Sequence, residues 1–161
     1  MNKTGSLQDI ALVAVVALVF AVVLLFAFKI ITEVDNKIQP MDVIPDNAKT
    51  ASTTLTSYYP GVMNNMFLFL VVGLAMVAFV LASLVRVNPV FIAFYLMALI
   101  IIIVICGVLS NIYQEIAATS QLSGFAVQLT FPTLILTYLP FFVGVFGSIL
   151  AIIMYKQWQN Q

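Results

Sequence analysis

The chain has 161 residues, of which 63% are hydrophobic and only 7% are charged, and its formal net charge is zero. Soluble domains carry about 25% charged residues, so this composition excludes a soluble domain with a polar surface. We therefore predict an all-α integral membrane protein, a single membrane domain over residues 1–161 built as a bundle of four transmembrane helices with a partly helical extramembrane loop. Four uncharged runs are long enough to cross a hydrocarbon layer of about 30 Å: Ile10 to Phe28, Met66 to Val85, Val90 to Leu109, and Leu134 to Tyr155.

The first predicted span covers about residues 10–32 and follows a short polar tail. Its apolar run is longer than the core of a cleaved signal peptide, and LLFAFKI at its end offers no small-residue cleavage site, so we expect it to remain as an anchor. A pilin-type leader is the alternative, because a glycine and an acid precede the apolar helix, but three further spans argue against a pilin. Lys29 can reach the headgroups on its long stem.

A polar loop is predicted over residues 33–63, and Pro40, Pro45 and Pro60 interrupt it. Within it, Asp46 is a suitable start for a short helix, and Pro60 is a suitable end. Such a helix would carry a mild apolar stripe at spacings of three and four and could lie on the membrane surface, with its tyrosines at headgroup level. A loosely ordered Thr/Ser-rich loop is the alternative. The stripe consists of Ala48, Ala51, Leu55, Tyr58 and Tyr59.

The second span, about residues 64–85, and the third, about residues 89–116, are joined by the sequence VRVNP. This turn is so short that the two spans must form an antiparallel hairpin, in which Pro89 opens the third span. Cys106 is the only cysteine, so no internal disulfide can form, and its apolar neighbours predict a buried small side chain.

The third span continues into SNIYQEIAATS, which contains Glu115, the only charged residue between Arg86 and Lys156. Glu115 lies about 9 Å of helix beyond the uncharged run, roughly where headgroups begin. Asn111 and Tyr113 beside it are also typical of the membrane interface. We therefore interpret Glu115 as an anchor at the water line, with an intramembrane carboxylate that binds an ion or a proton as the alternative.

The fourth span is predicted over about residues 132–156, after the connection QLSGFAVQLTFP. This connection is unusually apolar for a loop, so we expect it to lie in the membrane interface or under a partner. Pro140 removes a backbone donor near the start of the span, which predicts a kink whose free carbonyls are bonded by Thr137 or by a neighbouring helix. Such a kink can serve a gate, but shaping the packing of the helix is the simpler interpretation.

Small residues recur four apart in the fourth span, and such faces let helices approach closely. This pattern predicts tight helix packing, and it would be carried by Gly144, Gly147, Ser148 and Ala151. The end of the span, MYKQWQNQ, has the composition of an interfacial anchor, with Trp158 as its largest residue.

The positive charges leave the orientation undecided, because each side of the predicted membrane holds three of them. The side of the termini holds Lys3, Arg86 and Lys156, and the other side holds Lys29, Lys37 and Lys49. Most of the acids lie on the second side, and we expect both termini to face the cytoplasm.

Several kinds of chemistry have no suitable residues in this chain. It has no histidine and one cysteine, which excludes His-ligated metal sites and iron–sulfur clusters, and it has no phosphate-binding loop or nucleophile elbow. None of the four apolar cores holds a charge, as an ion or proton pathway would require. We predict no catalytic residue, no metal site, no cofactor, no enzyme activity and no nucleic-acid partner.

The order of elements resembles small multi-span membrane proteins of tailless icosahedral viruses with an internal membrane, the double-jelly-roll lineage of phages and archaeal viruses. The resemblance covers nearly the whole chain: an anchor span, a polar loop ending in Tyr59-Pro60, a hairpin, GVLSNIYQEIA, FPTLILTYLP and a last apolar span. Its best residues are Asn111, Tyr113, Glu115, Phe131, Pro132 and Pro140. The resemblance implies a structural protein of the virion membrane that ties lipid to capsid through its polar loop.

We therefore expect a non-enzymatic structural protein, multi-pass in a virion internal membrane or a host cytoplasmic membrane. Its expected partners are the lipid bilayer, other membrane or capsid proteins, and copies of itself. An accessory transmembrane subunit of a larger respiratory or transport complex is one alternative, and a small channel or transporter with its path between spans three and four is another. The candidate interface or anchor residues are Asn111, Tyr113, Glu115, Tyr58, Tyr59 and Trp158.

Overall fold

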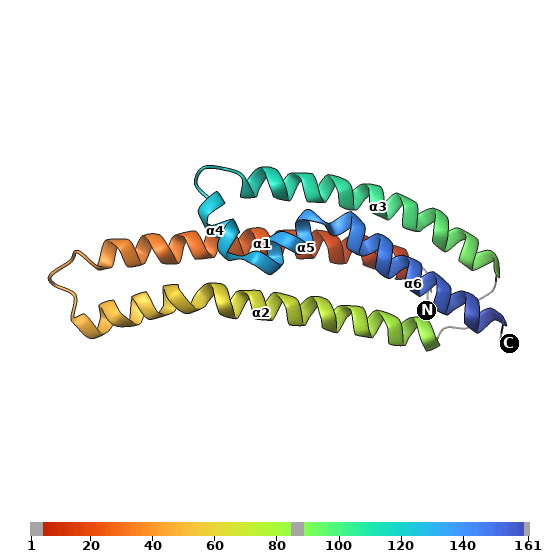
Figure 1. Ribbon diagram of the computed structural model, residues 1–161, viewed down its shortest axis with the longest axis horizontal. Helices are drawn as coiled ribbons and strands as arrows, with labels where there is room; N and C mark the ends of the chain where they lie inside the picture. Colours follow the sequence, from red (N-terminus) through yellow and green to blue (C-terminus); the bar gives the residue numbers. More distant parts are fainter. Residues whose placement is uncertain (1–4, 85–88, 160–161) are drawn as a thin grey trace.

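The computed structural model describes residues 5–84 and 89–159, with side chains described over residues 14–80 and 90–159. Every element in this part of the chain is a helix, as predicted. Four of the helices are long and apolar enough to cross a membrane: α1 (Gly5–Ile38), α2 (Asp46–Leu84), α3 (Pro89–Ala117) and α6 (Leu139–Gln159). Two short helices, α4 (Ser123–Gln128) and α5 (Thr130–Thr137), lie between α3 and α6 (Figure 1). Most of the predicted turn between spans two and three, including Arg86, lies outside the described residues.

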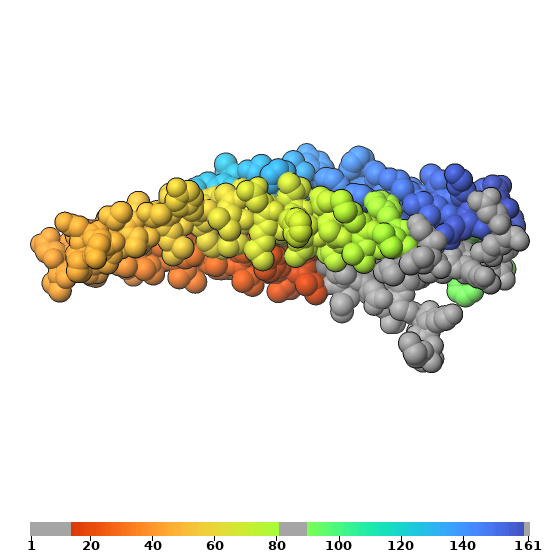
Figure 2. Space-filling view, turned by 90° about the horizontal axis from the view of Figure 1, so that it is seen from below, coloured from red at the N-terminus to blue at the C-terminus, as the bar shows by residue number. Residues whose placement is uncertain are grey.

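The first two helices are much longer than a membrane requires. α1 has 34 residues and α2 has 39, so at about 1.5 Å per residue they are about 50 and 60 Å long, whereas the hydrocarbon layer is about 30 Å thick. Their hairpin extends past the end of α3, while the start of α1 and the end of α6 lie toward the other end of the molecule (Figure 1). The space-filling view shows that α1 and α2 alone form the extended end (Figure 2).

The polar loop predicted over residues 33–63 is helical over most of that range, and the helix within it begins at Asp46 as predicted. α1 continues to Ile38 and α2 begins at Asp46, so only a short turn separates them, and Pro60 lies inside α2 instead of ending it. A proline inside a helix leaves one carbonyl without its donor and favours a break. Here Tyr59, the residue before Pro60, stacks on Phe28 of α1, and this long-range contact outweighs the local stop signal.

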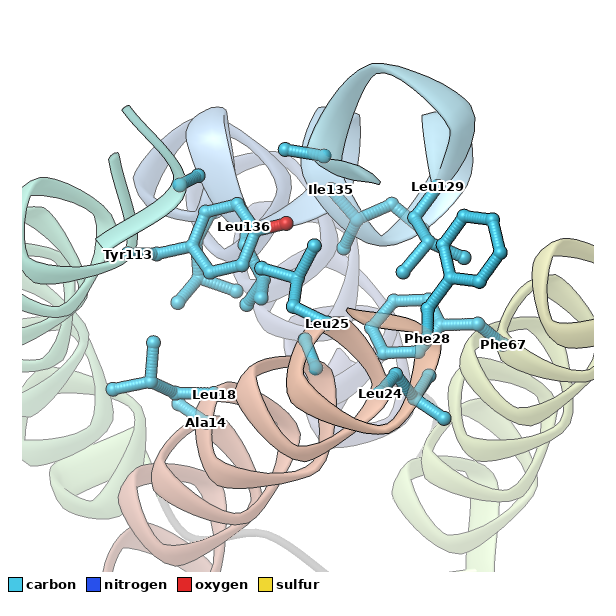
Figure 3. Close-up of a cluster of buried hydrophobic side chains, with 14 of the residues drawn as sticks. Ala14, Leu18, Leu24, Leu25, Phe28, Phe67, Tyr113, Leu129, Ile135 and Leu136 are labelled. Atoms are coloured by element: carbon cyan, nitrogen blue, oxygen red, sulfur yellow. The ribbon is translucent and has the colours of Figure 1, made fainter. Parts of the chain in front are cut away.

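The main apolar core lies where α1, α3, α4 and α5 meet, and α2 contributes to it from one side (Figure 3). Its largest fully buried side chains come from four different helices and from the junction of α4 and α5, which ties the short helices to the long ones: Phe28, Phe67, Tyr113, Leu136 and, at the junction, Leu129. A second, smaller cluster joins α3 to α6 and contains Tyr95, Leu99 and Ala151.

The apolar connection before the last span packs inside the chain itself. Residues 123–128 form α4, which folds back along α1, and the ring of Phe125 meets Phe28 edge to face with their centroids 5.2 Å apart. Leu122, Ala126 and Leu129 are buried. The connection is therefore apolar because it completes the core of the bundle, and no partner is needed to cover these three residues.

The fourth predicted span, about residues 132–156, is divided in the structure. Residues 130–137 form α5, and the helix is interrupted at Tyr138 before α6 begins at Leu139, one residue ahead of Pro140. The carbonyl of Leu136 loses its regular donor because Pro140 has no N–H. The backbone N–H of Tyr138 donates to the carbonyl of Leu134, its regular helical acceptor, and also approaches the carbonyl of Leu136.

Candidate functional site

The most distinctive feature of the molecule is the part of the α1–α2 hairpin that extends beyond the other helices (Figure 1). We call residues 33–57 the arm. Its charged residues are four acids and two lysines: Glu33, Asp35, Asp42, Asp46, Lys37 and Lys49. Charged side chains are costly in hydrocarbon, so the arm belongs in water.

A hydrogen-bond network centred on Gln39 holds the two helices of the arm together. Its side-chain Nε2 donates to Asp35 Oδ1 at 2.8 Å, to Thr53 Oγ1 at 2.8 Å and to the carbonyl of Lys49 at 3.2 Å. Thr53 Oγ1 also donates to Asp35 Oδ1 at 3.3 Å. Asp35 on α1 and Thr53 on α2 are thus joined through polar groups, so the arm has a defined shape without a large apolar core.

Asp35 is only 8% exposed although it lies in a polar part of the chain. The hydrogen bond from Gln39 lowers the pKa of this carboxyl, burial opposes that shift, and hydrogen bonds from Ser52 and Thr53 lower the pKa further. The ionised form is therefore the one that the arm stabilises.

The same end of the arm bears a shallow polar depression of about 420 Å³. Its walls contain hydroxyl, amide, carboxylate and ammonium groups, which suit contact with polar groups of another molecule. The lining residues are Gln39, Asp46, Lys49, Thr50, Thr53 and Thr54.

An aromatic layer forms the base of the arm. The ring of Tyr59 stacks on Phe28 with a centroid distance of 5.2 Å, and its hydroxyl donates to the carbonyl of Leu24 at 3.2 Å. Tyr59 is therefore buried inside the hairpin and does not serve as the interfacial contact that the sequence suggested. Tyr58, about 100° further around the helix, is 68% exposed and remains a candidate contact residue.

Lys29 links the base of the arm to the segment after α3. Its Nζ donates to Gln121 Oε1 at 2.8 Å and lies 3.6 Å from Glu33 Oε1, one turn along α1. Glu115, in the last turn of α3, is exposed, and so is Asn111 one turn earlier. Neither of these two side chains forms a hydrogen bond or ion pair with the described residues, so both are available for contacts outside the chain.

Tyr113 differs from its neighbours, because its side chain points into the core (Figure 3). It is fully buried, and its hydroxyl lies 2.8 Å from Thr133 Oγ1 on α5. Thr133 Oγ1 in turn contacts the carbonyl of Ala126 at 2.9 Å. The prediction that Tyr113 is an interface residue is therefore wrong: its ring fills the bundle, and its hydroxyl is bonded within the chain.

Ser110 bonds the backbone near the break between α5 and α6, one turn before Tyr113. Its Oγ donates to the carbonyl of Thr137 at 2.6 Å, and Gln114 Nε2 donates to Ser110 Oγ at 3.1 Å. The neighbouring helix α3 thus supplies a donor for a carbonyl at the break. The local sequence around Ser110 does not mark it as a site residue, although Cys106, Ser110 and Tyr113 lie three and four residues apart on one buried face of α3.

Asn64 on α2 is a second residue that the sequence analysis did not assign. Its Nδ2 donates to the carbonyl of Gln128 at 2.9 Å, and its Oδ1 accepts the backbone N–H of Phe131 at 3.1 Å. The carbonyl of Gln128 lacks its regular helical donor because Pro132 has no N–H. Asn64 therefore bonds both backbone groups left free at the junction of α4 and α5.

The small residues of α6 lie mostly on the face that packs against α3. A Cβ atom at Gly147 would overlap the side chain of Leu99, and a Cβ at Gly144 would lie 3.6 Å from Ile103 Cδ1. The hydroxyl of Tyr95 donates to the carbonyl of Gly147 at 3.1 Å, a contact that needs this close approach. Ala151 is buried on the same side.

Ser148 is exposed, unlike the other small residues of α6, and its hydroxyl donates to the carbonyl of Gly144 at 2.7 Å within the helix. At the far end of α6, the rings of Tyr155 and Trp158 lie 5.6 Å apart, and both residues are exposed. This pair lies at the opposite end of the molecule from the arm (Figure 1).

The described side chains include no group of three metal-ligating residues close enough to hold a metal ion. The polar groups between α3 and α5 bond to one another or to the backbone, and within the described part of the chain no buried polar side-chain atom lacks a partner. The features that can act on another molecule are therefore surfaces, namely the arm and the exposed faces of the long helices. Comparisons of the chain with protein-family models, with curated proteins and with solved structures find no match.

Proposed function

We propose that this chain is a non-enzymatic structural membrane protein whose four long helices cross the bilayer and whose arm holds a neighbouring protein beside the membrane. The observation that carries the proposal is the continuation of α1 and α2, as a paired and charged hairpin, past the ends of the other helices (Figure 1). From Phe28 in the aromatic layer to Ile38 at the end of α1, the hairpin rises about 15 Å.

A rigid arm suits this role better than a flexible loop does. The bonds among Asp35, Gln39 and Thr53 fix the two helices relative to each other before any partner arrives. Binding by a preorganised surface loses less conformational entropy than binding by a loop that must first become ordered. The polar depression near the tip offers hydroxyl and charged groups to a partner.

The partner that we propose is a capsid protein, so that the arm would join the internal membrane of a virion to its shell. This part of the proposal depends on the resemblance to membrane proteins of tailless icosahedral viruses. The absence of charge from the apolar runs and the concentration of charge on the arm support a scaffold that meets lipid along its length and protein at one end.

The polar groups between α3 and α5 favour a structural role over transport. An ion path needs polar groups that are free to replace the water around an ion. The Ser110 hydroxyl donates to the backbone carbonyl of Thr137, and the Tyr113 hydroxyl is hydrogen-bonded to the Thr133 hydroxyl. These polar groups are therefore already paired within the chain. Glu115 is exposed at the end of α3 and not enclosed between helices.

Photo-cross-linking from the tip of the arm tests the proposal. A photoreactive amino acid is placed at Val43, which is 94% exposed in the turn of the hairpin, and as a control at Ile152, which is 66% exposed on α6. In the intact membrane or particle, position 43 should form an adduct with a different protein, and position 152 should not.

Absence of a protein adduct from position 43 in intact material would contradict the proposed role of the arm. A flux assay on the purified chain in liposomes provides the second measurement. Ion flux above that of protein-free vesicles, reduced by Glu115→Gln, would identify a transporter instead.

A further inference from the structure

The outer face of α2 is the least covered long surface of the molecule. Only 6% of the most apolar window of α2 is buried, against 33% for α1 and 22% for α3. In the space-filling view α2 lies along the surface from the arm into the bundle (Figure 2). A run of large apolar side chains follows this face, and all of them are exposed: Leu55, Tyr58, Val62, Met66, Phe69 and Met76.

The spacing of this face is that of a two-helix coiled coil. Leu55, Val62, Phe69 and Met76 follow one another at intervals of seven residues, and Tyr58 lies at the intermediate position. Apolar residues repeated in this way form the seam between two helices that supercoil around each other. The seam ends before Phe79, whose ring packs against Phe146 of α6 instead.

Lipid cannot cover the whole seam. In the proposed arrangement Val62 and the residues after it lie at membrane depth, but Leu55 is part of the arm, and Tyr58 lies at its base next to the aromatic layer. Both side chains are more than half exposed, at 58% and 68%. The seam continues without interruption from the apolar part of α2 into the arm. The molecule that covers it should therefore be a protein that crosses the membrane and extends as far as the arm does.

The position of Asn65 on the seam favours a second copy of this chain as that protein. Asn65 occupies the intermediate seam position after Val62, it is exposed, and its side chain forms no hydrogen bond with the described residues, whereas the adjacent Asn64 bonds the α4–α5 junction. An amide carries both donors and an acceptor, and asparagine side chains bond across helix pairs in membranes. Two copies in the same orientation bring one Asn65 opposite the other.

From these observations we infer that two copies of this chain pair in parallel through the seam on α2, with Asn65 bonded to Asn65 of the second copy. Identical residues meet at the same height in such a pair, so a charged residue on the seam would lie opposite the same charge and repel it. The charged residues of the helix, Asp46 and Lys49, lie off the seam. The inference rests on the proposed function, because it takes the arm to stand outside the bilayer.

The area of the seam suits a stable pair. Aromatic side chains bury about 150–250 Å² each, so the exposed parts of Tyr58 and Phe69, 68% and 81%, supply roughly 300 Å². This is more than a third of the ~800 Å² per partner found in a standard interface. Leu55, Val62, Met66 and Met76, which are 49–62% exposed, add further apolar area to the seam.

Disulfide cross-linking of the full chain in its membrane tests the pairing. In a Cys106→Ala background, Val62→Cys should form a disulfide-linked dimer on mild oxidation, because identical seam positions of parallel helices lie within the reach of a disulfide. Val108→Cys is the matched control, since Val108 is 57% exposed on α3 and Val62 is 55% exposed. The control should stay monomeric.

A second variant examines the role of Asn65. Adding Asn65→Ala to Val62→Cys should lower the cross-linked fraction about threefold or more. A monomeric Val62→Cys, or equal cross-linking of Val62→Cys and Val108→Cys, would overturn the inference. Photo-cross-linking from position 43 to a different protein does not depend on the seam, so failure of the pair and failure of the proposed function give different results.

Discussion

Gly147 lies at the closest approach of α6 to α3, where a Cβ atom would overlap the side chain of Leu99. The missing side chain also lets the hydroxyl of Tyr95 reach the carbonyl of Gly147. One residue without a side chain therefore permits both the packing and the hydrogen bond between these helices. The same is not true of Gly107 on α3, which has no neighbour within 4 Å of a Cβ position.

This difference predicts opposite effects for two otherwise identical substitutions. Gly147→Ala should lower the free energy of unfolding by about 1–3 kcal/mol, because the extra methyl group forces Leu99 to move in a packed site. Gly107→Ala should be neutral or stabilising by up to about 1 kcal/mol, because alanine favours helix. Unfolding in mixed micelles measures both, and equal destabilisation of the two variants would count against the close approach.

Asp35 governs the pH response of the arm. Because hydrogen bonding, from Gln39 above all, lowers its pKa in the folded arm, the unfolded arm takes up the proton at higher pH. The carboxylate therefore contributes stability that is fully present above its ordinary pKa of 3.8. That stability is lost as the pH falls through the lowered value.

Spin labels on the two arm helices can measure this response. With cysteines at Asn36 and Thr54 in a Cys106→Ala background, we expect a constant distance between the labels from neutral pH down to about pH 5, and a broader distribution at pH values below 3.8. Asp35→Asn should remove the pH dependence, since an amide does not titrate in this range. A distribution that broadens equally in the variant would assign the effect to another group.

At the scale of the elements, helix breaks in this chain are stabilised by residues from other helices. Asn64 of α2 bonds the α4–α5 junction, and Ser110 of α3 bonds the carbonyl of Thr137 near the α5–α6 break. Each break coincides with a proline that lacks a donor, Pro132 or Pro140. The prolines are visible in the sequence, but their partners become visible only when distant helices are placed side by side.

Removal of the Asn64 side chain should therefore destabilise the bundle. Asn64→Ala removes the hydrogen bonds to the carbonyl of Gln128 and from the N–H of Phe131, and because both are exposed the loss should cost about 0.5–1.5 kcal/mol of the free energy of unfolding. The adjacent Asn65→Ala serves as the control and should leave the stability of the monomer unchanged. Both are measured in detergent at protein concentrations low enough to prevent pairing, and a neutral Asn64→Ala would show that the junction does not need this residue.

The four long apolar helices could be predicted from the sequence, but the ends of the first two could not. The number and approximate position of apolar runs depend on composition alone, and all four appear in the structure as helices long enough to cross a membrane. Where a helix ends depends on both local and long-range interactions. Pro60 destabilises α2 locally, while stacking of Tyr59 on Phe28 of α1 stabilises the helix at this point. A single sequence shows only the first of these effects.

Tyr113 is predicted to lie at the membrane interface because tyrosine is common there, but its side chain is buried in the core. Tyrosine near the end of an apolar run is typical of the membrane interface, and its neighbours Asn111 and Glu115 are indeed exposed. The better signal was the spacing of three and four residues through Tyr95, Leu99, Ile102, Cys106, Ser110, Tyr113 and Ala117, all of which are buried. Periodicity along the whole helix therefore outweighed composition around a single residue.

At the scale of the whole molecule, the arm and the Tyr155–Trp158 pair lie at opposite ends (Figure 1). A bilayer between these ends predicts that Val43→Cys and Trp158→Cys react with an impermeant thiol reagent from opposite sides, in a Cys106→Ala background. We expect position 43 to react from the non-cytoplasmic side, and position 158 from the cytoplasmic side. Reaction of both cysteines from the same side would contradict a chain that crosses four times.

Because Cys106 is completely buried, its reactivity can report how often the helices around it separate in the native protein. Its thiol is fully buried on the inward face of α3, so an alkylating reagent can reach it only when that helix swings away from α1 and α5. The rate at which the unmodified chain takes up a small permeant maleimide then reports the frequency of such openings, by the same logic that relates amide exchange to local unfolding. No substitution is needed for that measurement, because Cys106 is the only cysteine of the chain.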